Sequence, residues 1–172
     1  MERCRLILER MGAQGADPLG EAPSSIALQD LLGRIKERFP EQQGRIEVEL
    51  SNSSPRSCVL PARAAIEALG ALVKNALDAS PNGEPVVLQA KSSKEHLQFL
   101  VRDHGTGMTP EIIDRVAEPF FTTKPPGQGM GLGAFLAHLF AQRLGGSLSF
   151  ESTPGHGCTA ILELPVNTHV ER

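Results

Sequence analysis

The sequence predicts an α/β two-layer sandwich, in which helices pack against one mixed or antiparallel sheet. Apolar residues recur at helical spacing in three segments, and shorter segments between them alternate apolar and polar residues as strands do. The length of 172 residues suits one domain with a short appendage, and 40% hydrophobic residues are ordinary for a globular chain.

The first half of the chain contains two of these helical segments. In chain order we expect a helix over 1–11, a linker over 12–25, a helix over 26–39, strands over 45–50 and 58–60, and a helix over 61–79. Gly, Ala and Pro dominate the linker, and Pro61 suits the first position of a helix. In the first strand, Ile46, Val48 and Leu50 are expected to face one way.

The second half of the chain is richer in strands. We expect strands over 85–91 and 96–103, a short helix that opens at 109–111, an irregular segment over 118–133, a helix over 132–144, and a closing hairpin of 147–151 and 157–165. Thr109 is expected to cap its helix. Gly145 and Gly146 are expected to end the last helix.

Charge and cysteine content exclude several classes of protein. Lys and Arg number 17 against 20 Asp and Glu, so the net charge of −3 excludes a broad basic surface for nucleic acid or acidic membrane. Cys4, Cys58 and Cys158 are odd in number and far apart, which argues against disulfides and zinc sites. The start of the chain has charges inside its apolar stretch and is no signal peptide. We therefore expect a cytoplasmic fragment, whose parent protein is open to an anchor in the inner membrane.

Asn75 lies late on the helix predicted over 61–79. An asparagine at such a position is commonly a solvated polar residue. Its amide oxygen is also a hard donor that suits Mg²⁺, an ion that keeps several waters and takes other ligands from phosphates. Both interpretations are open from this residue alone.

Asp103, Gly105 and Gly107 form a D-x-G-x-G motif directly after an apolar strand. A tight turn is one interpretation, because Asp and Gly are common in turns. Recognition of a nucleobase is the other. A carboxylate can accept a hydrogen bond from the exocyclic amine of adenine, whereas guanine presents a carbonyl there and would leave both groups unpaired.

Residues 127–133 have glycine at every second position and lead directly into the helix predicted over 132–144. A flexible loop is one interpretation, and a phosphate site is the other, because backbone N–H groups at a helix start can face an anion. The segment lacks the Lys-Ser or Lys-Thr of a P-loop, and no G-x-G-x-x-G opens a first βα unit.

Residues 120–124 (FFTTK) place two aromatic residues and a cation just before this loop. The two Phe residues suit a hydrophobic latch for the loop, and Lys124 suits a point charge for phosphate. An exposed loop with a buried anchor is the plainer interpretation. A last glycine motif, at 155–159, indicates by itself only a turn.

Together and in this order, the motifs resemble the N, G1, F, G2 and G3 boxes of the GHKL superfamily (gyrase, Hsp90, histidine kinase, MutL), over nearly all of 26–165. Residues 118–124 followed by 131–133 resemble bacterial sensor histidine kinases in particular, and residues 125–133 are similar to the redox-responsive RegB/PrrB type. The resemblance implies the Bergerat fold, with a largely antiparallel sheet, and ATP and Mg²⁺ as ligands.

The resemblance also implies roles for individual residues. Asn75 would bind Mg²⁺, and Asp103 would bind the adenine amine. Gly105 and Gly107 would border the base, and Thr159 would lie beneath it. The remaining implied site residues belong to a lid over the phosphates or could reach the phosphates by charge: Gly129, Gly131, Leu132, Gly133, Lys74 and Lys124.

Several features depart from the family pattern. ATP-hydrolysing members carry a Glu one helical turn before the metal-binding Asn, where it acts as general base on water, but this chain has Ala71 there. Glu67 lies about one further turn back, too far to substitute. Asp78 stands where many members carry a basic residue, so we do not expect it to contact phosphate. None of the five histidines has the helical setting of a phosphoacceptor.

These observations predict the ATP-binding catalytic domain of a two-component sensor histidine kinase at 26–165. Residues 1–25 would be the end of a dimerisation helix plus linker, and 166–172 a tail. The partners would be the dimerisation domain that carries the acceptor His, and a response regulator. Cys4, flanked by two arginines, is a candidate redox-reactive thiol. The alternatives are a nucleotide-binding module without catalysis and another GHKL ATPase or serine kinase.

Overall fold

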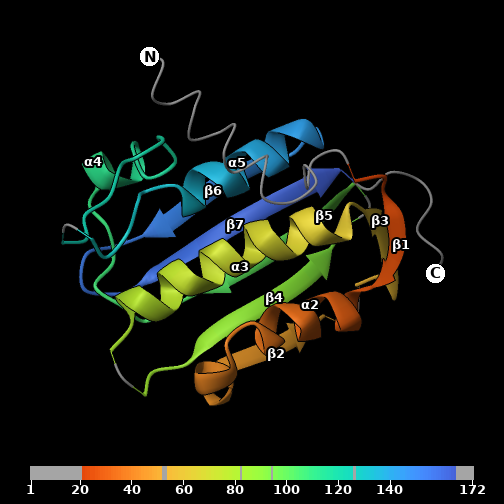
Figure 1. Ribbon diagram of the computed structural model, residues 1–172, viewed down its shortest axis with the longest axis horizontal. Helices are drawn as coiled ribbons and strands as arrows, with labels where there is room; N and C mark the ends of the chain where they lie inside the picture. Colours follow the sequence, from red (N-terminus) through yellow and green to blue (C-terminus); the bar gives the residue numbers. More distant parts are fainter. Residues whose placement is uncertain (1–20, 52–53, 82, 94, 126, 166–172) are drawn as a thin grey trace.

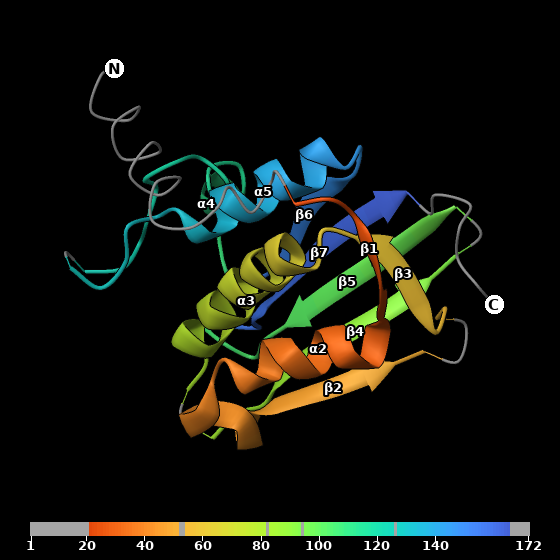
Figure 2. The same cartoon turned by 45° about the vertical axis from the view of Figure 1, so that its right-hand side comes forward.

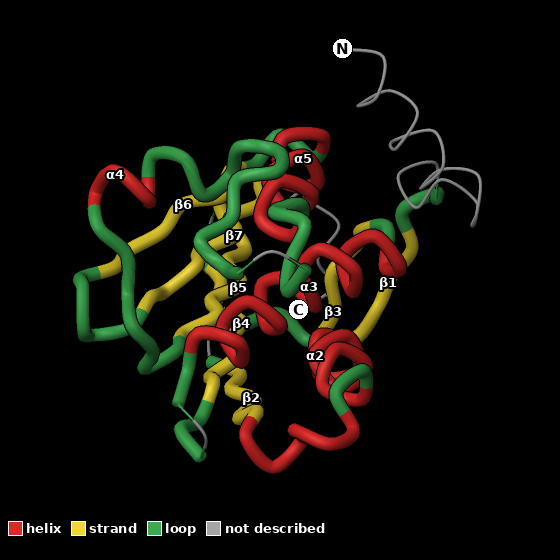
Figure 3. Tube along the Cα trace, turned by 60° about the vertical axis from the view of Figure 1, so that its left-hand side comes forward, coloured by secondary structure: helices red, strands yellow, loops and turns green. Residues whose placement is uncertain are grey.

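A sheet and a layer of helices make up the part of the chain that the structure describes, namely residues 21–51, 54–81, 83–93, 95–125 and 127–165. In this computed structural model, α2 (Leu28–Glu37), α3 (Ala62–Ala79) and α5 (Gly133–Arg143) cover one face of the main sheet (Figures 1 and 2). The short α4 (Pro110–Ile113) lies apart from this layer, among the loops at one end of the sandwich (Figure 3). Among the described residues, no helix is both long and apolar enough to cross a membrane.

The main sheet has five strands in the order β2-β4-β5-β7-β6. These are β2 (Ile46–Leu50), β4 (Val86–Ser92), β5 (His96–Arg102), β6 (Ser147–Ser152) and β7 (Cys158–Pro165). The β2–β4 pair is parallel, because the crossover through α3 brings the chain back to the same end of the sheet. The other three pairs are antiparallel. The predicted two-layer sandwich with a mixed, largely antiparallel sheet is confirmed.

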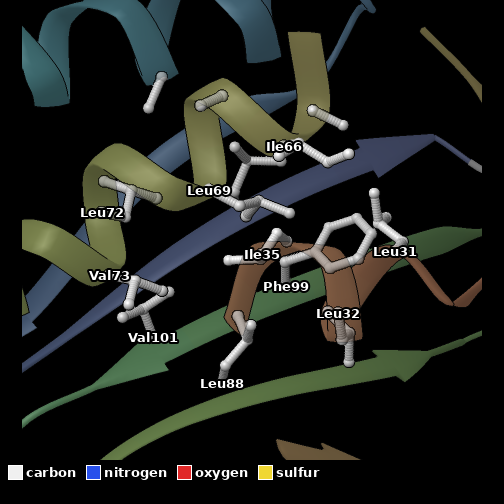
Figure 4. Close-up of a cluster of buried hydrophobic side chains, with 14 of the residues drawn as sticks. Leu31, Leu32, Ile35, Ile66, Leu69, Leu72, Val73, Leu88, Phe99 and Val101 are labelled. Atoms are coloured by element: carbon white, nitrogen blue, oxygen red, sulfur yellow. The ribbon is translucent and has the colours of Figure 1, made fainter. Parts of the chain in front are cut away.

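Aliphatic side chains fill the space between the two layers. The labelled residues of Figure 4 come from α2, α3 and the facing strands: Leu31, Leu32, Ile35, Ile66, Leu69, Leu72, Val73, Leu88, Phe99 and Val101. Burial of this apolar surface fixes α3 against the sheet. The position of the last turns of α3, which carry Lys74 and Asn75, is therefore fixed by this packing.

A two-stranded sheet at the other end of the molecule corrects one prediction. β1 (Ser24–Ala27) pairs antiparallel with β3 (Ser57–Leu60), with Ile26 opposite Cys58. The sequence pattern predicts a helix at Ile26, a linker at Ser24 and a domain that begins at residue 26. The helical period does extend back to Ile26, but pairing with a distant segment decides its conformation. The ordered domain therefore includes Ser24, and α2 begins at Leu28.

The edge strand β2 differs from expectation in its burial. Ile46, Val48 and Leu50 share a face, yet only Ile46 is buried, while Val48 and Leu50 are 37% and 41% exposed. Arg45 belongs to the 3₁₀ helix η1 (Pro40–Arg45) and not to the strand. The helix layer thus covers only the start of this edge.

Smaller differences concern element ends. Thr109 does occupy the N-cap position of α4, but its side chain makes no capping hydrogen bond. The predicted strands and the helix at 132–144 end within one or two residues of the observed bounds. The helix expected over 1–11 and the tail over 166–172 lie outside the described residues.

Candidate functional site

Two adjoining pockets lie at the carboxyl end of α3, where the chain leaves β5 and where the loop around α4 passes. The inner pocket has a volume of about 90 Å³ and the outer pocket about 310 Å³. Both are lined by Asn75, Ala79, Gly107, Met108 and Val116. The two pockets therefore form one continuous site, within the size range of small-molecule sites.

The inner pocket is an apolar slot with one acidic side chain. Its walls come from α3, the loop after β5, and the strands β5, β6 and β7. Leu72 and Phe150 are among the apolar wall residues, and Asp103 provides the carboxylate. A slot of this kind suits a flat apolar group that can donate a hydrogen bond to the carboxylate.

Asp103 is nearly fully buried and is oriented by backbone groups. Its Oδ1 accepts hydrogen bonds from the N–H groups of Gly105 at 2.8 Å and Cys158 at 3.2 Å. Within the described part of the chain, Oδ2 has no hydrogen-bond partner. Burial raises the pKa of Asp103 from its ordinary value, although the two backbone hydrogen bonds and nearby His104 act in the opposite direction. One oxygen is thus fixed and the other is left to accept from a ligand.

The outer pocket brings together cations, glycines and a helix start. Lys74 and Lys124 line it, as do Gly129 and Gly131. Leu132 and the first residues of α5, Gly133 and Ala134, form part of the same wall. The free N–H groups and the positive end of the α5 dipole therefore border this pocket. Its chemistry suits an anion such as a phosphate chain.

The lid, defined here as residues 118–125 and 127–133, is closed at its base by backbone contacts. The N–H of Phe120 donates to the carbonyl of Gly131 at 2.9 Å. Gly131 has φ +65°, and a Cβ there would collide with the carbonyl of Phe121. The two ends of the lid therefore cross at a point that requires glycine. Phe121 lines the outer pocket, with the Arg115 guanidinium 4.4 Å from its ring centre.

Asp78 links the lid to α3. Its Oδ2 accepts from Nζ of Lys124 at 2.7 Å and from Nζ of Lys74 at 2.9 Å. Burial by itself would raise the pKa of Asp78, but the hydrogen bonds and charges of the two lysines outweigh that effect and lower it. Asp78 itself does not line the outer pocket. The sequence pattern does not predict a contact of Asp78 with phosphate, and it does not reveal the two lysine partners.

Ala71 lies beside Asn75 in the wall of the outer pocket, one helical turn earlier on α3. Glu67 does not line either pocket and instead forms an ion pair with Arg38 at 2.6 Å. The geometry therefore agrees with the expectation that Glu67 is too far from the site to replace a carboxylate at position 71.

Two of the predicted site residues lie elsewhere. Gly105 packs behind Asp103, against the carbonyl of Ala79 at the end of α3, and not in the wall of either pocket. Thr159 alternates with the buried Ala160 and so points to the face of the sheet away from the helices, where it borders a hollow that shares Asp103 and Cys158 with the inner pocket. Because side chains alternate along β7, its neighbour Cys158 takes the place expected for Thr159 in the inner pocket.

The remaining predicted residues are brought together by the fold. Asn75, Asp103 and Gly107 line the inner pocket, and Lys74, Lys124 and the lid residues line the outer one. Cys4 lies outside the described residues. Cys158, Met108 and Phe150 are pocket residues that sequence reasoning missed. Strand alternation could have found Cys158, since Ala160 and Leu162 of the same face are buried apolar residues.

Comparison with known families agrees with this geometry. The family model described as "Histidine kinase-, DNA gyrase B-, and HSP90-like ATPase" matches residues 61–168, more than half of the chain. The chain belongs to this family. The resemblance based on the glycine boxes is thereby confirmed, and this GHKL domain contains all the pocket-forming elements from α3 to β7 within the matched region.

Relatives of this GHKL domain are sensor kinases. The sensor histidine kinase RegB of Cereibacter sphaeroides is 30% identical over 164 residues, which cover 87% of this chain and 34% of RegB. The sensor protein DegM of Bacillus sp. is 31% identical over 105 residues, which cover 61% of this chain and 28% of DegM. The chain thus spans about a third or less of the length of these curated relatives.

Solved structures show the same fold. ShkA, whose full-length structure was solved in complex with AMPPNP, aligns with a TM-score of 0.76 at 23% identity, over 88% of this chain and 32% of that one. The mycobacterial sensor histidine kinase MprB aligns with a TM-score of 0.71 at 22% identity, over 83% of this chain and 97% of that one. The Bergerat-type sandwich inferred from the sequence is therefore that of histidine kinase catalytic domains.

Proposed function

We propose that this GHKL domain is the ATP-binding catalytic domain of a two-component sensor histidine kinase. It would donate the γ-phosphoryl group of ATP to a His on a separate dimerisation domain. The observation that carries this proposal is the polarity of the site. An apolar slot with a single carboxylate forms one end of the site, and two lysines and a helix N-terminus form the other end. A nucleotide has the matching polarity.

Adenine would occupy the inner pocket. Oδ2 of Asp103, left without a partner, would accept from the exocyclic amine, while Met108 and Phe150 cover the base. The phosphates would then extend into the outer pocket toward Lys74, Lys124 and the start of α5. Because a carbonyl cannot donate to Oδ2, guanine nucleotides should bind more weakly.

Asn75 lies where the two pockets meet and is the residue that would hold Mg²⁺. Among the described residues, no group of three His, Cys, Asp or Glu side chains could hold a metal without a ligand. The amide oxygen of Asn75 is a hard donor, which fits an ion that takes its other ligands from phosphates and waters. Such an ion would neutralise phosphate charge.

The residues of the domain would contribute positioning and charge neutralisation, which is most of what phosphoryl transfer requires of a protein. The described histidines, His96, His104, His138 and His156, lie outside the walls of both pockets. The attacking imidazole would therefore come from a dimerisation domain. A response regulator would then receive the phosphoryl group, and the domain would work on the cytoplasmic side.

The experiment is phosphotransfer to a supplied acceptor. The chain is incubated with γ-³²P-ATP, Mg²⁺ and the dimerisation domain of the same kinase. We expect acid-labile, base-stable label on that domain, and none when Asn75→Ala replaces the wild-type chain. ATP binding without any label on the acceptor would favour a nucleotide-binding module. Release of phosphate without the acceptor would favour an ATPase, a class that Ala71 and the Arg38–Glu67 pair argue against.

A further inference from the structure

Asp78 stands one turn beyond Asn75 on α3 and bonds two lysines through a single oxygen. Lys74 belongs to the same helix, whereas Lys124 belongs to the lid, 46 residues away in sequence. Both lysines line the outer pocket, but the oxygen that they share lies outside its wall. The carboxylate thus draws both ammonium groups toward the rim of the site.

The Lys124–Asp78 pair ties the outer part of the lid to the helix layer. At its base the lid is closed on itself through Phe120 and Gly131, and Lys124 N–H bonds Thr122 within the lid. The ion pair at 2.7 Å joins this segment to α3. Both side chains of the pair are about 30% exposed, so solvent screens it less than a fully exposed pair.

We propose that Asp78 is a lid latch, which holds Lys124 and Lys74 in the nucleotide-free domain and competes with nucleotide phosphates for them. A carboxylate and a phosphate offer the same kind of oxygen to an ammonium group. The lysines cannot give their full charge to both. An entering triphosphate therefore competes with Asp78 for their hydrogen bonds and charge, and the negative charge of Asp78 remains close to the phosphates. The competition with nucleotide phosphates rests on the proposed function, whereas the latch between Asp78 and the lid does not.

The latch is tested with Asp78→Asn, which keeps the shape of the side chain and removes its charge. The matched control is Glu67→Gln, which breaks the Arg38 ion pair on the same helix but away from both pockets. Hydrogen exchange of the lid is measured without nucleotide. We expect lid amides of Asp78→Asn to exchange at least about twofold faster than wild type, whereas Glu67→Gln matches wild type. Equal lid exchange in wild type and Asp78→Asn would overturn the latch.

Competition is tested by titrating ATP and adenosine at low salt. Asp78→Asn should bind ATP about two- to fivefold more tightly than wild type and adenosine equally well, because only the phosphates meet the lysines. Lys124→Gln should loosen the lid like Asp78→Asn but bind ATP more weakly. Equal or weaker ATP binding by Asp78→Asn would overturn the competition. If wild type binds no nucleotide, the proposed function fails, and lid exchange still decides whether the latch exists.

Discussion

Asp103 and Cys158 hold each other through two hydrogen bonds. The N–H of Asp103 donates to the carbonyl of Cys158 at 2.9 Å, and the N–H of Cys158 donates to Oδ1 of Asp103 at 3.2 Å. The first bond extends the β5–β7 ladder by one residue, and the second fixes the carboxylate at the inner pocket. The carboxylate of Asp103, which is proposed to recognise adenine, is therefore oriented by backbone groups. A substitution at this position does not deprive another side chain of its hydrogen-bond partner.

Replacement of Asp103 by Asn should weaken ATP binding by about 1–3 kcal/mol. The variant keeps an oxygen for the Gly105 and Cys158 N–H groups, but it presents an amide N–H₂ where the adenine amine needs an acceptor. Titration calorimetry measures the change. Asp114→Asn, an exposed acid outside both pockets, is the control and should bind as wild type does. Equal affinity of the wild-type chain for ATP and GTP would refute adenine recognition by this residue.

The same substitution should stabilise the nucleotide-free fold at neutral pH. Burial raises the folded-state pKa of Asp103 above its ordinary value of 3.8, so above that pH the folded chain binds more protons than the unfolded chain. The free energy of unfolding of wild type therefore falls as the pH rises from the ordinary pKa of Asp103 through its raised pKa. The free energy of unfolding of Asp103→Asn does not have this pH dependence. Thermal melts should show the variant more stable at pH 7 and equal to wild type below 3.8. If Asp103→Asn is less stable than wild type at pH 7, burial of the charged Asp103 carboxylate does not destabilise the fold, and the prediction is wrong.

The alternation along β7 predicts opposite outcomes for two neighbouring residues. Thr159→Ala should leave ATP affinity within about twofold of wild type, because that side chain lies on the far face of the sheet. Cys158→Met should reduce ATP affinity by at least about tenfold, because the longer side chain would fill a slot of only about 90 Å³. Loss of affinity in Thr159→Ala would restore the role that the sequence resemblance implied. Melting curves of both variants separate effects on the pocket from effects on folding.

A feature could be predicted from the sequence when the residues that form it lie close together along the chain, and not when they lie far apart. Asn75, Asp103 and the lid glycines belong to local motifs, and the family resemblance that these motifs carry together implied that they share one site. The strand at Ser24–Ala27 depends on pairing with Ser57–Leu60. Because Ile26 also fits the helical spacing of the segment that follows, the sequence pattern predicts a helix there. The lysine pair of Asp78 depends on a lid residue 46 positions away, which no local pattern reveals. Thr159 was a different case, because the alternation that corrects it was present in the sequence.

The two described thiols, Cys58 and Cys158, should both react slowly. Burial raises the pKa of Cys58 to about 12, and burial together with the charge of Asp103 does the same for Cys158. At pH 8 roughly one such thiol in ten thousand is ionised, so both should react with iodoacetamide far more slowly than a free thiol. Rapid alkylation, located by peptide mass spectrometry, would then report on Cys4, the candidate redox thiol. If Cys4 reacts no faster than a free model thiol, a redox role there loses its chemical basis.

The chain without a partner should bind ATP and leave it largely intact. A general base must reach the attacking water within hydrogen-bond distance. Ala71 offers a methyl group beside Asn75, and Glu67 is engaged by Arg38 outside the pockets. Phosphate release measured with a coupled assay should therefore stay well below about 1 s⁻¹, the low end of common turnover numbers. Ala71→Glu places a carboxylate in the wall of the outer pocket and should gain slow hydrolysis, with Ala71→Gln as the control of equal size that cannot act as a base. If Ala71→Glu hydrolyses ATP no faster than Ala71→Gln, the site also fails to position the attacking water. The missing carboxylate is then not the sole reason that the wild-type chain does not hydrolyse ATP.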